Sequence, residues 1–329
     1  MRHGPHQDLH CIRRRNPGDP LRRPAGARGR RPFSRAQAHA DRPRPTRRWT
    51  DTFARALAHI AAAALGQEIV IDNKDGGGGA LGVTHLVAAR PDGYTLALVW
   101  NGPLTATPHN LTVPYAPTNY RPLLSIGYSS YVLCMRTGPD VANAASFAAH
   151  LKANDGKLSY GHDGAGGTMQ LAAERVFDRL GVSLRGVPFG GAAETAEALV
   201  GGMIDVYGGS LPPILPHVAA GRVVCPLLTS AGGNEALPGA EGLGALGLEA
   251  EETVLWWGLL VPANTPEDIV ARLTDAFAAA VRSPQFETLL RRKGAVPRLL
   301  GGSETAALIN EEFAALAQVS RAIASRQSR

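Results

Sequence analysis

Residues 51–82 read DTFARALAHIAAAALGQEIVIDNKDGGGGALG and join a helix pattern, a strand pattern and a glycine loop. Apolar residues at helical spacing mark one face of the first helix: Phe53, Leu57, Ile60 and Ala64. Gly66 ends this pattern, and the apolar run at 68–72 is typical of a buried strand. The glycines at 76–79 then form a turn before a helix that extends to residue 89. This order predicts an α/β fold.

The same alternation continues to the C-terminus. Further strands are predicted at 94–100, 123–135, 158–160, 184–188, 203–207, 222–229 and 253–261. Further helices are predicted at 144–153, 168–180, 192–200, 266–282, 284–293 and 304–325. Strands that alternate with helices favour mostly parallel sheets, because each helix returns the chain to the same edge of the sheet.

The composition is that of a globular chain. The 329 residues are 44% hydrophobic and 19% charged, and the length suits about two domains. Residues 1–48 hold 14 Arg, no Lys and three Asp, a net charge of +11, so the remainder carries −5 of the formal total of +6. A mildly acidic body argues against a surface that binds nucleic acid phosphates. The sequence contains no apolar run of about 18 residues, so it predicts no membrane-spanning helix.

Residues 1–48 have a different character from the rest of the chain. They are rich in Arg, Pro, Gly and His, show no apolar periodicity and are therefore predicted to be disordered. They also lack the apolar stretch of a secretory signal. Two explanations stay open, a basic tail that binds anionic polymers or a segment outside the natural reading frame. We favour the second.

Motifs for metal, nucleotide or catalytic chemistry are mostly missing. Cys11, Cys134 and Cys225 are too widely spaced for a disulfide framework or a zinc site, and neither a metal nor a cofactor is expected. The G-x-G-x-x-G at 77–82 lacks the acid expected about 20 residues later, and neither glycine cluster continues as a Walker loop, so a tight turn is the simplest interpretation. Cys134 and Cys225 are expected to be buried, and the tryptophans at 256–257 are expected to pack in the core or between domains rather than to form a stacking platform.

A second glycine loop, YGHDGAGG at 160–167, ends at Thr168, which begins an amphipathic helix. A strand, a glycine turn and a helix N-terminus present free backbone amides and a positive dipole end to an anion. His162 and Asp163 have three open interpretations: an acid–base pair, an exposed loop histidine, or a contact with a ligand. Asp205 lies within an apolar run and is interpreted as a strand-end residue bonded to amides, with ligand contact as the alternative.

The order of several segments resembles the substrate receptors of tripartite tricarboxylate transporters, the Bug family. These segments are IVIDNKDGGGGALG at 69–82, AARPDGYTLAL at 88–98, YGHDGAGGTMQLAAE at 160–174, GVPFGGAAETAEALVGGMIDVYGGSLPPILPHVAAGRV at 186–223 and WWGLLVPANTPEDIVARL at 256–273. The resemblance runs from about Thr50 to the C-terminus. Their joint order, more than any single motif, makes the resemblance specific.

The resemblance implies a periplasmic binding protein of the type II, Venus flytrap architecture, with a ligand cleft between two domains and no enzymatic activity. Domain 1 would comprise 49–126 plus 229–329 and domain 2 would comprise 127–228, with chain crossings near 125–129 and 226–230. The implied ligand is a dicarboxylate, tricarboxylate, aromatic acid or acidic amino acid, held by loop amides and hydroxyls and delivered by a monomeric receptor to a membrane permease. A ligand sensor, or an enzyme that uses His162, remains an alternative.

This sequence also departs from the family. Relatives begin with a strand and a P-F-x-x-G-G loop before the Thr-Asp that stands here as Thr50-Asp51, so the first domain is expected to lack a central strand and one wall of the cleft. The family's Gly-Ser is Gly161-His162 here, and its helix-opening threonine lies one place later, at Thr168. The family's tyrosine and the basic residue after it are Phe189-Gly190, and a polar residue beyond Asp205 is Gly209, so ligand specificity cannot be transferred. The predicted ligand-binding residues are Asn73, Gly78, Gly79, Gly161, His162, Gly164, Gly166, Thr168, Gln170, Phe189, Gly191, Asp205 and Ser210.

Overall fold

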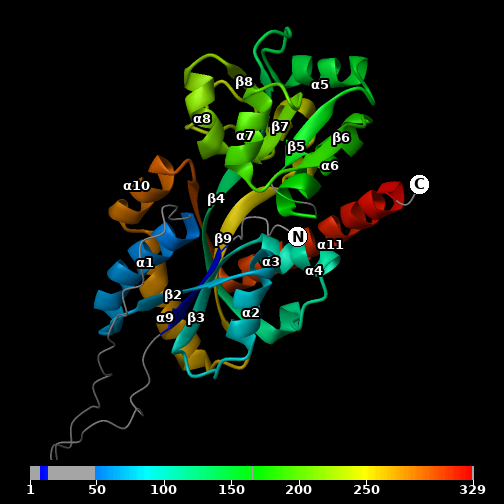
Figure 1. Cartoon of the computed structure of the whole chain (residues 1–329). Helices are drawn as coiled ribbons and strands as arrows, with labels where there is room; N and C mark the ends of the chain where they lie inside the picture. The colour runs from blue at the N-terminus through cyan, green and yellow to red at the C-terminus, as the bar shows by residue number, and fades with distance from the viewer. Residues whose placement is uncertain (1–7, 14–48, 163, 165, 328–329) are drawn as a thin grey trace, which may run out of the picture.

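The computed structural model describes residues 8–13, 49–162, 164 and 166–327 and arranges them as two lobes (Figure 1). The lower lobe contains β1 (Asp8–Arg13), α1 (Trp49–Leu65), β2 (Val70–Asp75), α2 (Ala80–Val87), β3 (Thr95–Trp100), α3 (Gly102–Thr105), α4 (Thr107–Asn110), β9 (Val254–Pro262), α9 (Glu267–Val281), α10 (Pro284–Arg292), β10 (Val296–Gly301) and α11 (Gly302–Gln327). The upper lobe contains α5 (Ala144–Ala153), β5 (Ser159–His162), α6 (Thr168–Leu180), β6 (Arg185–Pro188), α7 (Ala192–Val200), β7 (Val206–Ser210), α8 (Leu211–Ala219) and β8 (Val223–Leu228). The predicted α/β class is confirmed.

One long strand, β4 (Tyr120–Arg136), takes part in the sheets of both lobes. Its first part pairs with β9 and β10 in the lower lobe, and from Tyr131 onward it pairs with β7 and β8 in the upper lobe. All four of these pairings are antiparallel. Among the strands that the structure describes, the parallel pairs are β5 with β6 and β5 with β7, so the expectation of mostly parallel sheets is wrong. The long strand β4 runs from one lobe to the other, and β9 returns beside it in the opposite direction, so the two strands are antiparallel. The local alternation of helices and strands does not reveal this pairing.

Residues 8–13 contradict two expectations about the N-terminal segment. They form β1, which lies between β2 and β3 and runs antiparallel to both, so residues 1–48 are not wholly without structure. Ile12 lies opposite Ile71 on one side and opposite Leu96 on the other. The central strand position of the lower-lobe sheet, which the sequence predicts to be empty, is therefore occupied by β1. Without a strand between them, the facing edges of β2 and β3 would expose unpaired backbone amides and carbonyls. The backbone of β1 forms hydrogen bonds with both edges.

The lower lobe encloses two apolar cores on either side of its sheet. Phe53 and Leu57 of α1 are fully buried against Trp257 in one of them, whereas Trp256 lies in the other. The predicted core positions of both tryptophans are confirmed. The buried face of α1 differs in its last turn from the prediction, because Ala64 is exposed and the face ends at the buried residues Ala61 and Leu65.

The upper lobe contains a disulfide between Cys134 of β4 and Cys225 of β8. Both cysteines are buried, as predicted, but the expectation that their spacing excludes a disulfide is wrong. The antiparallel pairing of β4 with β8 places their Cα atoms 4.0 Å apart, although 91 positions separate them in the sequence. A contact between such distant positions leaves no local pattern.

The chain returns from the upper lobe later than the family resemblance suggests. Leu237, Ala240 and Leu243 follow β8, yet they pack in the two apolar cores of the upper lobe. These contacts favour a second crossing at Thr253, just before β9, over one at 226–230.

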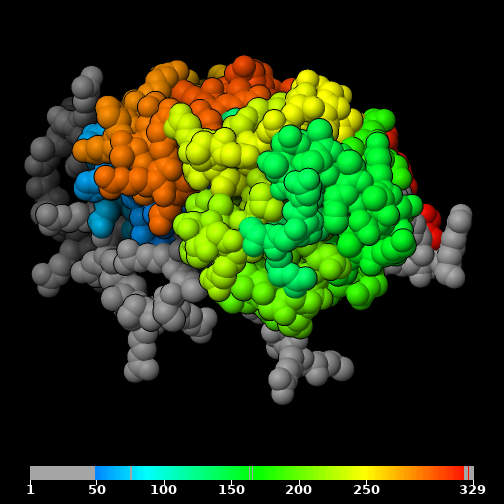
Figure 2. Space-filling model, turned by 90° about the horizontal axis from the view of Figure 1, so that it is seen from above, coloured from blue at the N-terminus to red at the C-terminus, as the bar shows by residue number. Residues whose placement is uncertain are grey.

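Seen from above, the upper lobe occupies most of the view and α10, in orange, lies beside it (Figure 2).

Candidate ligand-binding site

The first glycine loop joins β2 to α2 in the lower lobe. Gly79 has φ of +89°, and a Cβ at this position would lie 2.3 Å from Cγ of Pro103, so only glycine fits. The N-terminal turn of α2 contains no acidic residue. The loop therefore combines a helix N-terminus with backbone amides that no carboxylate of its own first turn neutralises.

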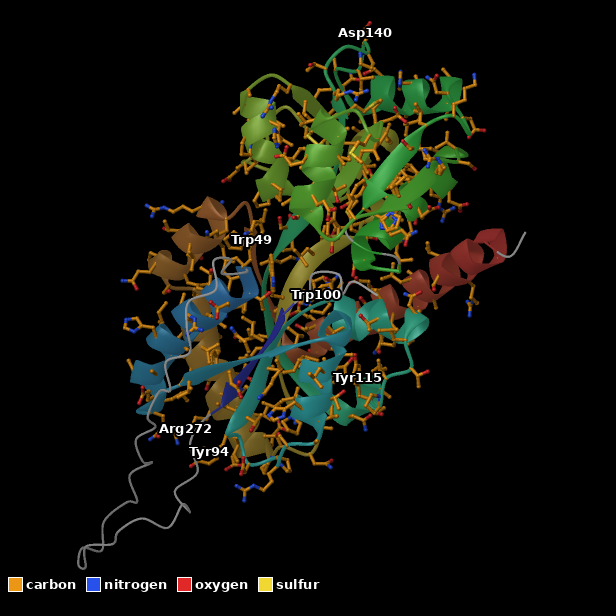
Figure 3. All side chains as sticks on the ribbon, viewed as in Figure 1. Trp49, Tyr94, Trp100, Tyr115, Asp140 and Arg272 are labelled. Atoms are coloured by element: carbon orange, nitrogen blue, oxygen red, sulfur yellow. A yellow bond between two sulfur atoms is a disulfide. The ribbon has the colours of Figure 1, made fainter. Side chains whose placement is uncertain are left out.

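Two other residues near the first loop have specific surroundings. Asn73 donates a hydrogen bond from Nδ2 to Oδ1 of Asp51 in α1, at 3.2 Å, which directs this amide group toward the helix. Gly78 accepts a hydrogen bond on its carbonyl oxygen from the Thr107 hydroxyl of α4, at 3.2 Å. Trp100, at the end of β3, lies at the upper end of the lower lobe (Figure 3).

The second glycine loop joins β5 to α6 in the upper lobe. Thr168 is the first residue of α6, and its side chain is buried, with 2% of the residue exposed. Its hydroxyl oxygen has no hydrogen-bond partner among the residues that the structure describes. Buried hydroxyl groups normally have a partner, and α6 has no acidic residue in its first turn. This helix N-terminus therefore has both a free dipole end and an unused polar side chain.

Side chains within the second loop fix its shape. Gln170 accepts a hydrogen bond on Oε1 from the amide of Gly166, at 2.6 Å. Gly161 allows close packing, because a Cβ there would lie 2.4 Å from Cδ1 of Ile204 and 2.7 Å from Cγ2 of Thr195. The side of Gly161 that a side chain would occupy is therefore filled by the upper-lobe core.

His162 is buried, with 1% of the residue exposed, so the interpretation as an exposed loop histidine is wrong. Its Nδ1 lies 2.8 Å from the carbonyl oxygen of Gly164, and because a carbonyl can only accept, Nδ1 carries the proton of this bond. Burial lowers the pKa of the imidazole, although the bond to Gly164 opposes this shift. Burial is the larger of the two effects, so the net shift favours the neutral ring. Asp163, the proposed acid–base partner, lies outside the described residues.

The third predicted segment lies at the start of α7. Gly191 is the N-cap of this helix. Phe189 directly follows β6, and its amide donates to the carbonyl oxygen of His162, at 2.9 Å. Glu194, in the first turn of α7, accepts a hydrogen bond from the amide of Gly190, at 2.8 Å. This helix N-terminus is thus partly neutralised by its own acid, which makes it a weaker anion site than α2 or α6.

Asp205 directly precedes β7, and Ser210 is the last residue of this strand. Asp205 accepts hydrogen bonds on Oδ2 from the amide and from the hydroxyl of Ser159, both at 2.8 Å, at the start of β5. The second glycine loop follows the other end of β5, so Asp205 is not brought together with it. Ser210 lies opposite Tyr131, where β4 enters the upper lobe. The geometry thus supports the strand-end interpretation of Asp205.

A short helix that the sequence analysis did not single out connects the two glycine loops. Thr107 of α4 contacts Gly78, and Asn110 of the same helix donates a hydrogen bond from Nδ2 to the carbonyl oxygen of Gly166, at 2.8 Å. The loops therefore lie on either side of α4. The only signal in the sequence was a run of Thr, Pro and Asn without periodicity.

Asn101, also missed from sequence, lies fully buried between β3 and α3. Its Nδ2 donates to the Val254 carbonyl oxygen at 2.9 Å and to Oε1 of Glu312 at 2.5 Å. Glu312 of α11 also accepts hydrogen bonds from Trp256 and Thr105. Burial raises the pKa of the Glu312 carboxyl to about 7, and these three bonds oppose the rise.

A cavity of about 200 Å³ opens beside β4 and β9 where the two lobes meet. Tyr128, Arg175, Glu252 and Arg298 are among its polar lining residues, and none of the predicted ligand-binding residues lines it. In the described part of the chain no group of three or more His, Cys, Asp or Glu is arranged to hold a metal ion. None of the helices described here is both long enough and apolar enough to cross a membrane.

Comparison with known proteins identifies the family. A sequence model of the tripartite tricarboxylate transporter family receptor matches residues 53–324. A protein of Cupriavidus necator, named for its position in the gbd 5' region, is 30% identical over 78% of this chain and 78% of its own length.

Solved structures agree with this relationship. MatC of Rhodopseudomonas palustris with bound malate is 28% identical, with a TM-score of 0.66 over 82% of this chain and 94% of its own. The R. palustris protein Rpa4515 with adipate is 26% identical, with a TM-score of 0.69 over 83% of this chain and 92% of its own. These similarities confirm the two-domain binding-protein fold and a solute-binding, non-enzymatic role. The chain belongs to the family of receptors of tripartite tricarboxylate transporters.

Proposed function

We propose that this protein is a periplasmic receptor that captures a small carboxylate between its lobes and delivers it to the membrane permease of a tripartite tricarboxylate transporter. The family assignment and the malate and adipate bound by two similar proteins support a carboxylate ligand. The disulfide between Cys134 and Cys225 suits an oxidising compartment such as the periplasm. We expect the receptor to act as a monomer.

The unpartnered hydroxyl of Thr168 is the observation that carries this proposal. It lies at the N-terminus of a 13-residue helix, where backbone amides and the positive end of the dipole favour a carboxylate. A ligand carboxylate would accept a hydrogen bond from this hydroxyl. Hydrogen bonds to a charged group are worth roughly 1.5–3 kcal/mol each, so about four of them reach the 8 kcal/mol of micromolar binding before ordering costs are subtracted.

We assign ligand contact first to the two helix N-termini without acidic residues, on α2 and α6. The proposed residues there are Gly78, Gly79, Gly164, Gly166 and Thr168. We place Asn73, Gly161, His162, Gln170, Phe189, Gly191 and Ser210 around them, as residues that shape the loops or line the cleft. Asp205 is left out of this proposal. Both hydrogen bonds of its carboxylate are to Ser159 at the start of β5, whereas the second glycine loop follows the end of β5.

The proposal is tested by removing one hydroxyl. Thr168→Val keeps the shape of the side chain, and we expect it to weaken carboxylate binding about tenfold without lowering the melting temperature, because the lost hydroxyl has no partner among the described residues. Isothermal titration with malate, adipate and citrate, after a thermal-shift screen with the same acids, measures this effect.

Thr195→Val is the matched control. Thr195 is also buried in the upper lobe, but its hydroxyl donates to the carbonyl oxygen of Gly191, at 2.9 Å. We expect this variant to lower the melting temperature and to leave affinity unchanged. Equal carboxylate affinity in wild type and Thr168→Val would overturn the proposed contact, and the absence of any carboxylate binding by the folded wild type would overturn the proposed function.

A further inference from the structure

The side chain of Asn110 connects three separate segments of the protein. Its Nδ2 donates to the carbonyl oxygen of Gly166 at 2.8 Å and to that of Ala106 at 3.1 Å, and its Oδ1 accepts from the Ser320 hydroxyl of α11 at 3.1 Å. Both amide hydrogens and the amide oxygen are therefore used. The bond to Gly166 crosses from the lower lobe to the ligand loop of the upper lobe.

Gly166 is suited to this close approach. It has φ of +70°, and a Cβ built on it would lie 2.5 Å from Cγ of Asn110. An L-amino acid at this position would therefore be strained and would also collide with the asparagine. The loop backbone and the Asn110 side chain fit only when residue 166 has no side chain.

An apolar contact between the lobes lies beside this bond. Ala106, between α3 and α4, and Leu316 of α11 pack in the lower lobe against Leu171 of α6, and all three are buried. Figure 1 shows α11, in red, extending past α4 toward α6. The lobes are therefore held together at the ends of α4 and α11, as well as by β4 and β9.

We propose that Asn110 is a positioning residue, a latch that ties the second glycine loop to the lower lobe and thereby sets the lifetime of the bound ligand. The inference rests on the proposed function and deepens it. The bond joins the two lobes, so any opening that moves α4 away from the second glycine loop must break it. A loop that is already ordered by the latch also loses less conformational entropy when a carboxylate binds to it.

Asn110→Asp tests the latch without changing side-chain shape. The aspartate retains an oxygen that accepts from Ser320, but it places an acceptor where an amide donated to Gly166. We expect ligand dissociation to become about fivefold faster, because the loss of one hydrogen bond of modest strength changes a rate by about this factor. Stopped-flow with malate or adipate measures the dissociation rate. The association rate is expected to change much less.

Asn154→Asp is the matched control. Asn154 of the upper lobe makes the same bond to the residue four places earlier, from Nδ2 to the carbonyl oxygen of His150, at 2.9 Å. In the described part of the chain its side chain has no hydrogen bond to the other lobe. The two variants therefore lose the same local bond, and only Asn110→Asp also loses the interlobe bond. Equal dissociation rates in these variants would overturn the latch.

A second measurement needs no ligand. Hydrogen exchange followed by mass spectrometry in the peptide covering 160–171 reports the order of the second loop, and we expect faster exchange in Asn110→Asp than in wild type or Asn154→Asp. Unchanged exchange there would overturn the inference even if no carboxylate bound to the wild type. Faster exchange without carboxylate binding would support the latch while contradicting the proposed function, so the two failures are distinguishable.

Discussion

The two lobes are stabilised in different ways. The described strands of the upper lobe come from one continuous stretch that ends at β8, and a disulfide joins two of them. The sheet of the lower lobe instead combines three distant segments, because β1 fits between β2 and β3 while β9 returns from the far side of the upper lobe. Both lobes contain strands paired over long distances in the sequence, but only in the upper lobe does a disulfide between described residues reinforce such a pair.

The largest expected effect is on the lower lobe. Ile12→Pro removes a backbone N–H from a strand that is paired on both sides, which costs about 3 kcal/mol or more and disrupts the pairing of β2 and β3 as well. We expect a large fall in melting temperature and fast hydrogen exchange in the lower lobe alone. Asp140→Pro, at the exposed tip of the upper lobe (Figure 3), is the control. Identical melting of Ile12→Pro and wild type would mean that β1 contributes no stability.

The next effect is on the upper lobe. Replacing both Cys134 and Cys225 by Ala removes a bond that spans 91 positions, and we expect a loss of about 4 kcal/mol in unfolding free energy from the greater freedom of the unfolded chain. Urea unfolding with and without a reductant measures this loss. The wild type should become less stable in reductant and the double variant should not respond. A reductant-insensitive wild type would place the stability of the upper lobe in its apolar cores alone.

A smaller effect, again on the lower lobe, concerns the buried carboxyl of Glu312. Burial raises its pKa from 4.5 to about 7, so between these pH values the folded protein binds more protons than the unfolded chain. The contribution of Glu312 to stability is therefore lost as the pH rises through this interval, by about 3 kcal/mol in total. Subtracting the unfolding free energy of Glu312→Gln from that of the wild type at each pH isolates this change. Glu311→Gln, which removes a carboxyl from the exposed side of the same helix, is the control, and a flat difference for Glu312→Gln would refute the prediction.

The upper lobe was the more predictable of the two. The helices expected at 144–153, 168–180 and 192–200 are confirmed as α5, α6 and α7. The helix α8 was missed, because the three prolines in LPPILPHVA argue against a helix when only local preference is considered. In the lower lobe β10 was missed as well, and β1 lies in a segment whose composition predicts disorder.

The candidate site was predictable only in part. The two glycine loops and the helix that begins at Thr168 were visible in the sequence, because glycine turns and helix starts depend on neighbouring residues. The contacts of Asn110 and Asn101 were not visible, since both depend on α11, which lies about two hundred positions further along the chain. The burial of His162 also required the packed upper lobe.

Local patterns in the chain were enough to predict the alternation of helices and strands, the glycine loops and the resemblance to receptors of carboxylate transporters. These features follow from the local spacing of apolar residues and glycines, which acts over a few positions. Three features became visible only in the folded protein: which strands are neighbours, the bond between Cys134 and Cys225, and the contact of Asn110 with the opposite lobe. Such contacts depend on the distance between residues in space after the chain has packed, and no local periodicity encodes that distance.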